Sequence, residues 1–308
     1  MISVAMATYN GEKYIKKQLQ SIVEQTVIPD EIVISDDCSK DRTLEIIDSF
    51  IKSYNNINWI IKKGTRNQGY IRNFYNAINY TTGDIIILAD QDDLWDKDKV
   101  KLFRDWFTQN IDMLSIHTDY YIIDQNDNII GNKQIGYAEY LRKYSVDRFC
   151  KRLNYCGMSS AFRNTIKKEL LSINPDKIPT HDWIIHAISV LNDGMYVSNM
   201  ATSFRRYHGD NVALNIEKRK ERKGINQRIE IVREFKQYYQ LMRNIISKRN
   251  KNYAQMEYVE KLIYIQKKRI EYLKKRNIYD WFIDIKYIKY YPSLKSYFCD
   301  FIYISGIF

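Results

Sequence analysis

The sequence predicts an α/β protein with a mostly parallel central sheet, flanking helices and a helical appendage at the C-terminal end. Short apolar runs alternate with helix-like segments over residues 2–90, and a polar loop follows each run. Beyond residue 214, apolar and aromatic side chains instead recur three and four positions apart. With 308 residues, 45% of them hydrophobic, the chain is long enough to bury one large core and to carry an appendage.

Four apolar runs are predicted to be buried strands, and the three segments between them are predicted to be helices. We expect the strands at residues 2–7, 31–35, 57–61 and 84–89, and the helices at residues 12–25, 41–52 and 70–80. Such alternation makes a parallel sheet with helices on both faces, and ligands bind beyond the carboxyl ends of its strands. The residues directly after each run are therefore expected to line the functional site.

An acidic cluster stands at the end of the fourth run, where residues 85–95 read IIILADQDDLW. The carboxylates of Asp90, Asp92 and Asp93 repel one another unless a cation or hydrogen-bond donors surround them, which favours a divalent metal bound by oxygen ligands. The alternative is ordinary turn chemistry, in which Asp96 or Asp98 only caps the helix expected next along the chain. Both interpretations place the cluster at the end of a strand.

Charge is distributed unevenly along the chain. Residues 215–308 hold 22 Lys and Arg against 10 Asp and Glu, whereas residues 1–214 hold 26 against 27. The four cysteines form no C-x-x-C pair and no zinc-like spacing, which is typical of reduced thiols. We see no secretion signal and no apolar run long enough to span a bilayer, so we expect a cytoplasmic protein on the inner face of the cell membrane.

Four motifs in this order resemble the nucleotide-binding half of the inverting family 2 glycosyltransferases, which have the GT-A fold. They are SVAMATYNG at residues 3–11, DEIVISDDCSKDRT at 30–43, NQGYIRN at 67–73 and ADQDDLW at 89–95. The resemblance covers residues 1–210 and is greatest to bacterial enzymes that build capsule, O-antigen or other cell-surface polysaccharides, a group often described as rhamnosyltransferases. It implies a catalytic domain at 1–214, with a nucleotide-binding half at 1–95 and an acceptor half at 96–214, followed by a tail at 215–308.

The resemblance also implies which residues contact the nucleotide. Residues at the ends of the first two strands would lie beside the base and ribose, and an arginine on the third helix would face the base or phosphate. The expected nucleotide-binding residues are Thr8, Tyr9, Glu12, Asp37, Arg72, Asp90 and Gln91. These assignments rest on the family's motifs, since each residue taken alone is also a common helix cap or loop residue.

Two residues are the implied metal ligands. Asp90-Gln91-Asp92 matches the family's D-x-D motif, in which Asp92 binds the metal directly and Asp90 faces the ribose or a metal-bound water. His208 matches a late R-x-H-G-x-N segment whose histidine reaches the metal or the diphosphate. Mn²⁺ or Mg²⁺ suits carboxylates that share a cation with a diphosphate.

Asp182 is the implied catalytic base, because it matches the aspartate of the family's H-D-W segment at the start of a helix expected at 183–191. The alternative is that Thr180 and Asp182 only cap that helix. The residues implied to contact the donor or acceptor sugar are Gly157, Met158, His181 and Trp183. Ile184 and Asp210 depart from the family's pattern and leave the choice of sugar and acceptor open.

The tail predicts two long helices at 225–248 and 253–276, followed by an aromatic and basic segment at 279–308. Rings at headgroup depth and lysines facing anionic lipid would bring the enzyme to a membrane surface. Packing on the body or in a homodimer is the alternative, and nucleic-acid binding is the least supported of the three.

The predicted function is transfer of a sugar from a dTDP- or UDP-linked donor to a hydroxyl of a glycan or lipid-linked oligosaccharide, with inversion at the anomeric carbon and a divalent metal. A sugar nucleotidyltransferase is one alternative, but it needs a glycine-rich phosphate loop where this chain has TYNGEKY. A catalytically inactive, membrane-bound scaffold is the other alternative. The combination of Asp92, Asp182 and His208 argues for an active enzyme.

Overall fold

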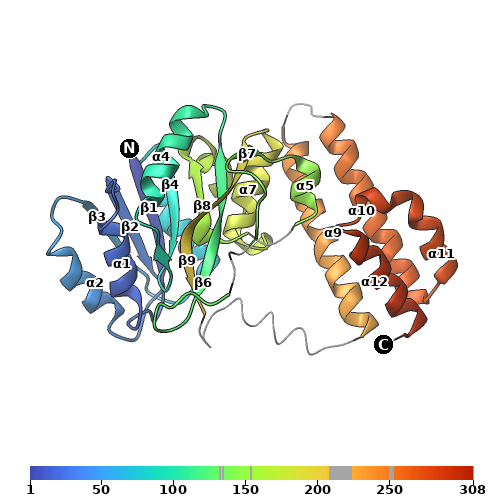
Figure 1. Ribbon diagram of the computed structural model, residues 1–308, viewed down its shortest axis with the longest axis horizontal. Helices are drawn as coiled ribbons and strands as arrows, with labels where there is room; N and C mark the ends of the chain where they lie inside the picture. Colours follow the sequence, from blue (N-terminus) through green and yellow to red (C-terminus); the bar gives the residue numbers. More distant parts are fainter. Residues whose placement is uncertain (132, 134, 153–154, 208–223, 250–252, 308) are drawn as a thin grey trace. The chain divides into compact units, whose positions relative to one another are not determined.

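The computed structural model describes residues 1–131, 133, 135–152, 155–207, 224–249 and 253–307. The chain forms two compact units (Figure 1). The first comprises the described residues of 1–144 and 154–208, and the second comprises those of 145–153 and 209–308. A short helix at Val146–Cys150 therefore groups with the C-terminal unit, although its position in the sequence lies within the expected catalytic domain.

The first half of the central sheet is parallel, with the strand order β3-β2-β1-β4. Its elements are β1 (Ile2–Thr8), α1 (Ile15–Val23), β2 (Glu31–Asp36), α2 (Thr43–Ile51), β3 (Asn58–Lys63), α3 (Tyr70–Tyr80) and β4 (Ile85–Asp90). All four predicted strands and all three predicted helices are present. The helix predicted at 70–80 has these bounds in the structure, and the other elements differ at one or both ends. The first helix begins at Ile15 because the chain first makes a turn in which the amides of Tyr14 and Ile15 both donate to the carbonyl of Gly11 at 3.0 Å.

The second half of the sheet mixes strand directions, in the order β4-β8-β6-β9-β5, with β7 paired to β9. Its strands are β5 (Leu94–Trp95), β6 (Ser115–Ile123), β7 (Arg142–Lys143), β8 (Ser160–Arg163) and β9 (Met195–Arg206). β8 lies antiparallel between β4 and β6, whereas β6 and β9 are parallel. The helical elements of this half are α4 (Lys99–Gln109), η1 (Gly157–Ser159), η2 (Asn164–Ile166), α6 (Lys167–Leu171), η3 (Pro175–Lys177) and α7 (His181–Leu191).

Helices cover both faces of the sheet and bury its apolar side chains. The helices α1, α2 and α4 share one core with strand residues such as Val4, Ile32 and Ile87, all fully buried. The helix α3 packs against β1 and β2, and α7 packs against β6. Every residue of α7 is buried, and its first turn lies two residues earlier than the sequence predicts. Burial of this extent holds the end of α7 firmly in the first unit.

The second unit is helical. It contains α5 (Val146–Cys150), α9 (Ile225–Ser247), α10 (Tyr253–Lys275), α11 (Ile278–Ile283), η5 (Asp284–Tyr290) and α12 (Leu294–Ser305). The two long helices match their predicted ranges closely. The rings of Trp281, Tyr291 and Tyr297 are buried in this unit's own core, so these three aromatic residues of the expected membrane segment serve packing instead. Among the described residues, no helix is long and apolar enough to cross a membrane.

Candidate active site

The carboxyl ends of β1, β2 and β4 bring three of the expected loops together at one edge of the sheet. Thr8 pairs in register with Asp36, and Ala7 pairs with Asp90. The loops after β1 and β4 are joined by a reciprocal pair of hydrogen bonds: the amide of Tyr9 donates to Gln91 Oε1 at 2.8 Å, and Gln91 Nε2 donates to the carbonyl of Tyr9 at 2.9 Å. The Tyr9 side chain itself is exposed. The edge is thus one connected surface.

Asp37 holds the loop that leads into α3. Its carboxylate accepts hydrogen bonds from the amides of Gln68 at 2.8 Å and Gly69 at 2.7 Å, and its own amide donates to the carbonyl of Thr8 at 2.9 Å. Gly69 has φ +88°, a backbone conformation that favours glycine. The aspartate expected to contact base or ribose therefore also shapes the loop beside the expected nucleotide site.

In the acidic cluster Asp93 is buried, Asp90 and Asp92 are half-buried, and the three carboxylates repel one another. Burial and the neighbouring charge of Asp92 raise the pKa of Asp90 to about 7. Burial, again with the charges of Asp92 and Asp90, raises the pKa of Asp93 well above its usual range. Asp93 accepts a hydrogen bond from the amide of Arg206 at 2.8 Å. A cation bound here would relieve this repulsion.

The donor atoms fit a divalent cation in kind, but they do not form a closed cage. Among the described residues, no group of three or more His, Cys, Asp and Glu side chains is arranged to hold a metal. Hard cations such as Mg²⁺ commonly complete their shell with water and substrate phosphates. The alternative interpretation, in which Asp96 or Asp98 only caps the next helix, is only partly met. Asp98 directly precedes α4, but its side chain forms no capping hydrogen bond and instead accepts one from Thr26 Oγ1 at 2.9 Å.

The start of α7 carries the expected base. Asp182 is buried, and its Oδ1 accepts a hydrogen bond from the amide of Trp183 at 2.7 Å, while Thr180 Oγ1 accepts from the same amide at 3.3 Å. Thr180 and Asp182 therefore also cap α7, as the alternative interpretation expects. The start of α7 lies near the end of β4, because a Cβ atom added to Gly157 would contact both His181 Nε2 and Asp90 Oδ2. Burial is the main cause of the raised pKa values of Asp90 and Tyr70, and the charge of Asp182 adds to both.

His181 lies beside the same edge with an unusual lack of partners. It is 4% exposed, its ring stacks on Phe74 with the centroids 3.8 Å apart, and neither ring nitrogen has a hydrogen-bond partner. Burial lowers the pKa of His181, so the ring is neutral at pH 7 and offers one donor and one acceptor. Since buried polar atoms are normally paired, the ring is suited to a ligand hydroxyl.

The segment at η1 passes close to His181. A Cβ atom added to Gly157 would lie 2.7 Å from His181 Nε2 and 3.8 Å from Asp90 Oδ2, so only glycine fits there without displacement. The next residue, Met158, is buried, and its carbonyl accepts a hydrogen bond from Ser203 Oγ at 2.9 Å. Trp183 is also buried, with 1% of its surface exposed.

Two expected site residues form ion pairs with other side chains, and a third lies outside the described residues. Arg72 forms an ion pair with Asp176, with Nε 3.0 Å from Oδ1, and lines a polar pocket of about 290 Å³ together with Gln68 and Pro175. Glu12 accepts a hydrogen bond from Arg42 Nε at 3.3 Å. His208 lies outside the described residues. Its proposed contact with the metal stays a prediction.

Two buried cations beside the acidic cluster were missed by the sequence analysis. Lys99 is fully buried, donates to Ser203 Oγ at 2.9 Å and to the carbonyl of Met158, and lies 4.1 Å from the centre of the Trp95 ring. Burial lowers the pKa of Lys99 well below its usual range. Arg206 donates through Nε to the carbonyl of Asp92 at 2.9 Å. No sequence pattern distinguishes them from the surface lysines and arginines around them.

The sequence relationships agree with this architecture. The family model described as Glycosyl transferase family 2 matches residues 3–172. The chain is 33% identical over 235 residues to dTDP-rhamnosyl transferase RfbG of Shigella flexneri, covering 68% of this chain and 74% of that protein. It is 29% identical over 154 residues to the Escherichia coli glucosyltransferase WfgD, covering 47% of this chain and 57% of that protein. The chain therefore belongs to glycosyltransferase family 2.

Solved structures share the fold. Staphylococcus aureus TarS, residues 1–349, in complex with UDP-GlcNAc has a TM-score of 0.63 at 19% identity, covering 86% of this chain and 72% of that chain. The mannosyltransferase PcManGT from Pyrobaculum calidifontis, in complex with GDP-Man and Mn²⁺, has a TM-score of 0.56 at 14% identity, covering 100% of this chain and 75% of that chain. The predicted GT-A fold is confirmed, and the enzyme transfers a sugar from a nucleotide sugar.

Proposed function

We propose that this enzyme transfers a sugar, with inversion and with the help of a divalent metal, from a dTDP- or UDP-linked donor to a hydroxyl of a bacterial cell-surface glycan or lipid-linked oligosaccharide. RfbG is named a dTDP-rhamnosyl transferase, and WfgD is named for a UDP-Glc donor and a diphosphoundecaprenol-linked acceptor. Those names favour a dTDP or UDP donor and an acceptor of this kind. The family membership argues against a nucleotidyltransferase.

One observation carries the proposal: the start of α7 faces the end of β4. Gly157 lies between Asp90 and His181 with no room for a side chain. Burial and the charge of Asp92 raise the pKa of Asp90, and the charge of Asp182 adds to this shift. Inverting transfer needs a carboxylate base on one side of the sugar and stabilisation of the departing diphosphate on the other. The two ends of this site contain the residue types that those two tasks require.

Asp182 is proposed as the base that takes the proton of the acceptor hydroxyl. Its Oδ1 is engaged by the Trp183 amide, which orients the carboxylate and leaves Oδ2 to face the acceptor. His181, neutral and unpartnered, is proposed to hold a hydroxyl of the donor or acceptor sugar. Gly157 would allow the sugar to approach the backbone closely.

Asp92 is proposed to bind Mn²⁺ or Mg²⁺, with Asp90 in support and with His208 as a further ligand. When bound, such a cation offsets the negative charge of a departing diphosphate. The raised pKa of Asp90 supports this proposal, because a carboxyl beside like charges gains most from a nearby cation. Thr8, Tyr9 and Asp37 are proposed to line the nucleotide side of the site.

Two measurements on the full chain test this function. Thermal shift with a panel of UDP-, dTDP- and GDP-sugars, with and without Mn²⁺, is expected to show stabilisation by a UDP or dTDP donor that depends on the metal. Asp92→Asn should abolish the metal dependence. Asp48 is an exposed carboxylate paired with Lys63, so Asp48→Asn is the matched control and should leave the metal dependence unchanged. No stabilisation by any nucleotide sugar in the presence of the metal would refute the proposal.

The second measurement separates the base from the helix cap. Asp182→Asn keeps an acceptor for the Trp183 amide, so we expect an unchanged melting temperature with kcat reduced by about 10² to 10⁴, the usual contribution of a general base. Nuclear magnetic resonance of the product should show an inverted anomeric centre. Equal losses of stability and activity would assign Asp182 to capping only, and full stability with full activity would remove it from the mechanism.

A further inference from the structure

The C-terminal unit exposes apolar side chains in two rows. On α12, Leu294, Phe298 and Ile302 are spaced four residues apart, share one face of the helix, and are 63%, 55% and 41% exposed. On α11 and the start of η5, the row consists of Ile278, Phe282 and Ile285, which are 46%, 61% and 50% exposed. The two helices are neighbours, since the ring centroids of Trp281 and Phe301 lie 4.8 Å apart. We call these six residues the apolar tail surface.

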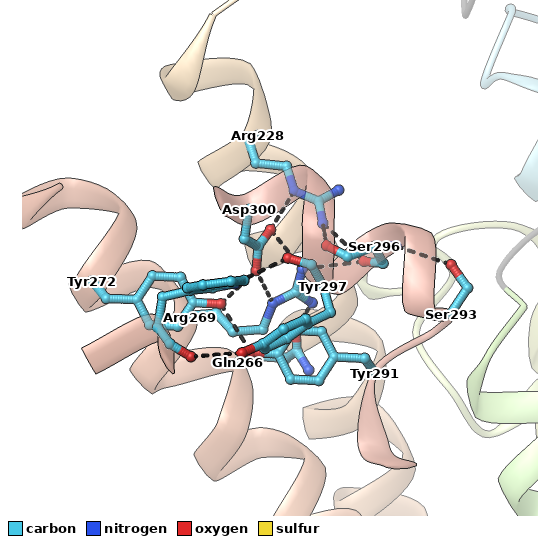
Figure 2. A network of polar contacts seen from close by, with 10 residues as sticks. Arg228, Gln266, Arg269, Tyr272, Tyr291, Ser293, Ser296, Tyr297 and Asp300 are labelled. Atoms are coloured by element: carbon cyan, nitrogen blue, oxygen red, sulfur yellow. Dashed lines mark hydrogen bonds and ion pairs between the residues drawn. The ribbon is translucent and has the colours of Figure 1, made fainter. Parts of the chain in front are cut away.

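The opposite face of α12 is buried and carries a charge. Figure 2 shows Asp300 enclosed by two arginines: Arg228 Nε donates to its Oδ1 at 2.6 Å, and Arg269 Nε donates to its Oδ2 at 2.8 Å. The hydroxyl of Tyr272 donates to Oδ2 at 2.5 Å, and Ser296 Oγ accepts from Arg228 at 2.8 Å. Asp300 is fully buried. The helix α12 thus buries a carboxylate together with Tyr297 and Ile304, and it exposes Leu, Phe and Ile on its other face.

This network fixes which face of α12 points outward. Turning the helix to bury its apolar row would move Asp300 away from Arg228 and Arg269 and leave two buried guanidinium groups without a counter-charge. The arginines come from α9 and α10, so three helices would have to change together. The exposure of Phe298 and its neighbours is therefore built into the unit and is not a consequence of loose packing.

The exposed charges in the same stretch of chain as the apolar tail surface are mostly positive. Between residues 274 and 307, all of which are described, the exposed cationic residues are Lys274, Lys275, Arg276, Lys286, Lys289 and Lys295. The only exposed acidic residue in this range is Asp280, because Asp284 and Asp300 are buried and paired with cations. This combination of apolar rows and an excess of lysine and arginine has a net attraction for an anionic, apolar-cored surface.

We propose that the apolar tail surface docks on an anionic lipid bilayer. Phe282, Phe298 and the aliphatic residues of the two rows enter the boundary between headgroups and acyl chains, and the surrounding lysines contact lipid phosphates. A second copy of the chain is disfavoured as the occupant, because the same excess of positive charge would face itself. The rows are mainly aliphatic, which suits acyl chains better than stacked nucleobases.

Vesicle sedimentation with the full chain tests the docking. Phosphatidylcholine vesicles with phosphatidylglycerol are expected to bind the protein, and pure phosphatidylcholine vesicles to bind it at least tenfold more weakly. The double variant Phe282→Ser, Phe298→Ser should reduce the partition coefficient at least tenfold, since both side chains lose their burial in lipid. Replacing Lys286, Lys289 and Lys295 with Gln should reduce it by roughly fivefold per lysine at low salt.

Matched controls keep this test independent of folding and of sugar transfer. Ile111 is 82% exposed in the first unit, so Ile111→Ser is the control for the Phe variants and should leave vesicle binding unchanged. Lys168 is exposed in the same unit, so Lys168→Gln is the control for the Lys variants and should also leave it unchanged. The tail variants should keep their melting temperature and their donor-induced thermal shift. Equal binding to both vesicle types, or binding unaffected by the Phe variants, would overturn the proposal. So would a dimer, measured by light scattering, that is lost in the Phe variants.

Discussion

The Cα of Gly157 lies so close to the imidazole of His181 that an added Cβ would stand 2.7 Å from Nε2. His181 cannot yield easily, because its ring is stacked on Phe74 and held at the start of a fully buried helix. The backbone of η1 and the ring of His181 thus approach each other closely beside Asp90. This pair brings η1 and the start of α7 to the acidic end of β4.

Gly157→Ala should therefore destabilise the protein and weaken donor binding. We expect the free energy of unfolding to fall by about 1–3 kcal/mol, the usual cost of overpacking. His181→Ala removes the clash, so the double variant should be more stable than the sum of the single effects, with a coupling of about 0.5–3 kcal/mol. Urea unfolding of the four proteins in this cycle measures the coupling. Strict additivity would show that the two groups do not touch.

Arg206 should matter for stability and for metal response. Arg206→Ala removes the Nε donor to the carbonyl of Asp92 and the ion pair with Asp127, whereas the backbone amide that donates to Asp93 remains. We expect a loss of about 3 kcal/mol in the free energy of unfolding and a smaller Mn²⁺-induced thermal shift. Arg206→Lys should be intermediate, since lysine lacks the planar fork. Arg104→Ala, an exposed arginine, is the control, and an equal effect there would contradict the assignment.

His186 should make the first unit sensitive to acid. It is fully buried between Ser115 Oγ at 2.9 Å and Ser160 Oγ at 3.0 Å, and burial lowers its pKa from 6.5 to about 3. Below pH 6.5 the unfolded chain binds a proton that the folded protein refuses, so the free energy of unfolding falls by about 1.4 kcal/mol per pH unit until pH approaches 3.

His186→Gln keeps a side chain that can bond to hydroxyls but does not titrate. Between pH 7 and pH 5 the variant should lose about 2 kcal/mol less stability than the wild type, as measured by urea unfolding at each pH. The comparison isolates this residue from the other buried histidines. Parallel curves for the two proteins would mean that His186 is protonated in the folded state.

Asp300→Ala should unfold the helical unit far more readily than any surface change there. Removing the carboxylate leaves Arg228 and Arg269 buried and uncompensated, at a cost of about 3–5 kcal/mol. Glu257→Ala on the exposed face of α10 is the control and should change stability by about 0.5 kcal/mol or less. Circular dichroism during thermal unfolding would detect the loss. A small effect would mean that the arginines find other partners.

The parallel half of the fold could be predicted from the sequence because each strand there is a short, continuous apolar run. The strands β1 and β4 are almost entirely apolar, β2 has the apolar centre Ile32–Ile34, and a helical pattern follows each of the three along the chain. The antiparallel half could not be predicted in the same way. The strand β8 has only four residues, and β5 and β7 have two each, so they carry too few positions to show a period.

The candidate site was predictable only where a residue stands directly after a strand. Asp90 and Asp37 could be placed in this way, whereas Lys99 and Arg206 could not, since a buried lysine or arginine has the same letters around it as an exposed one. The capping bonds of Asp182 and the partnerless ring of His181 depend on tertiary packing. The family motifs supplied what local patterns could not.

The buried carboxylate of α12 also determines when, during synthesis, the helical unit can complete its ion pairs. The helices α9 and α10 leave the ribosome before Asp300 does, and until that residue is made each of them carries an arginine with no anion to meet it. The ion pairs of Arg228 and Arg269 can form only after α12 has been made. A chain that ends before Asp300 would thus leave Arg228 and Arg269 without their counter-charge, and we expect its helical unit to be more open to proteolysis.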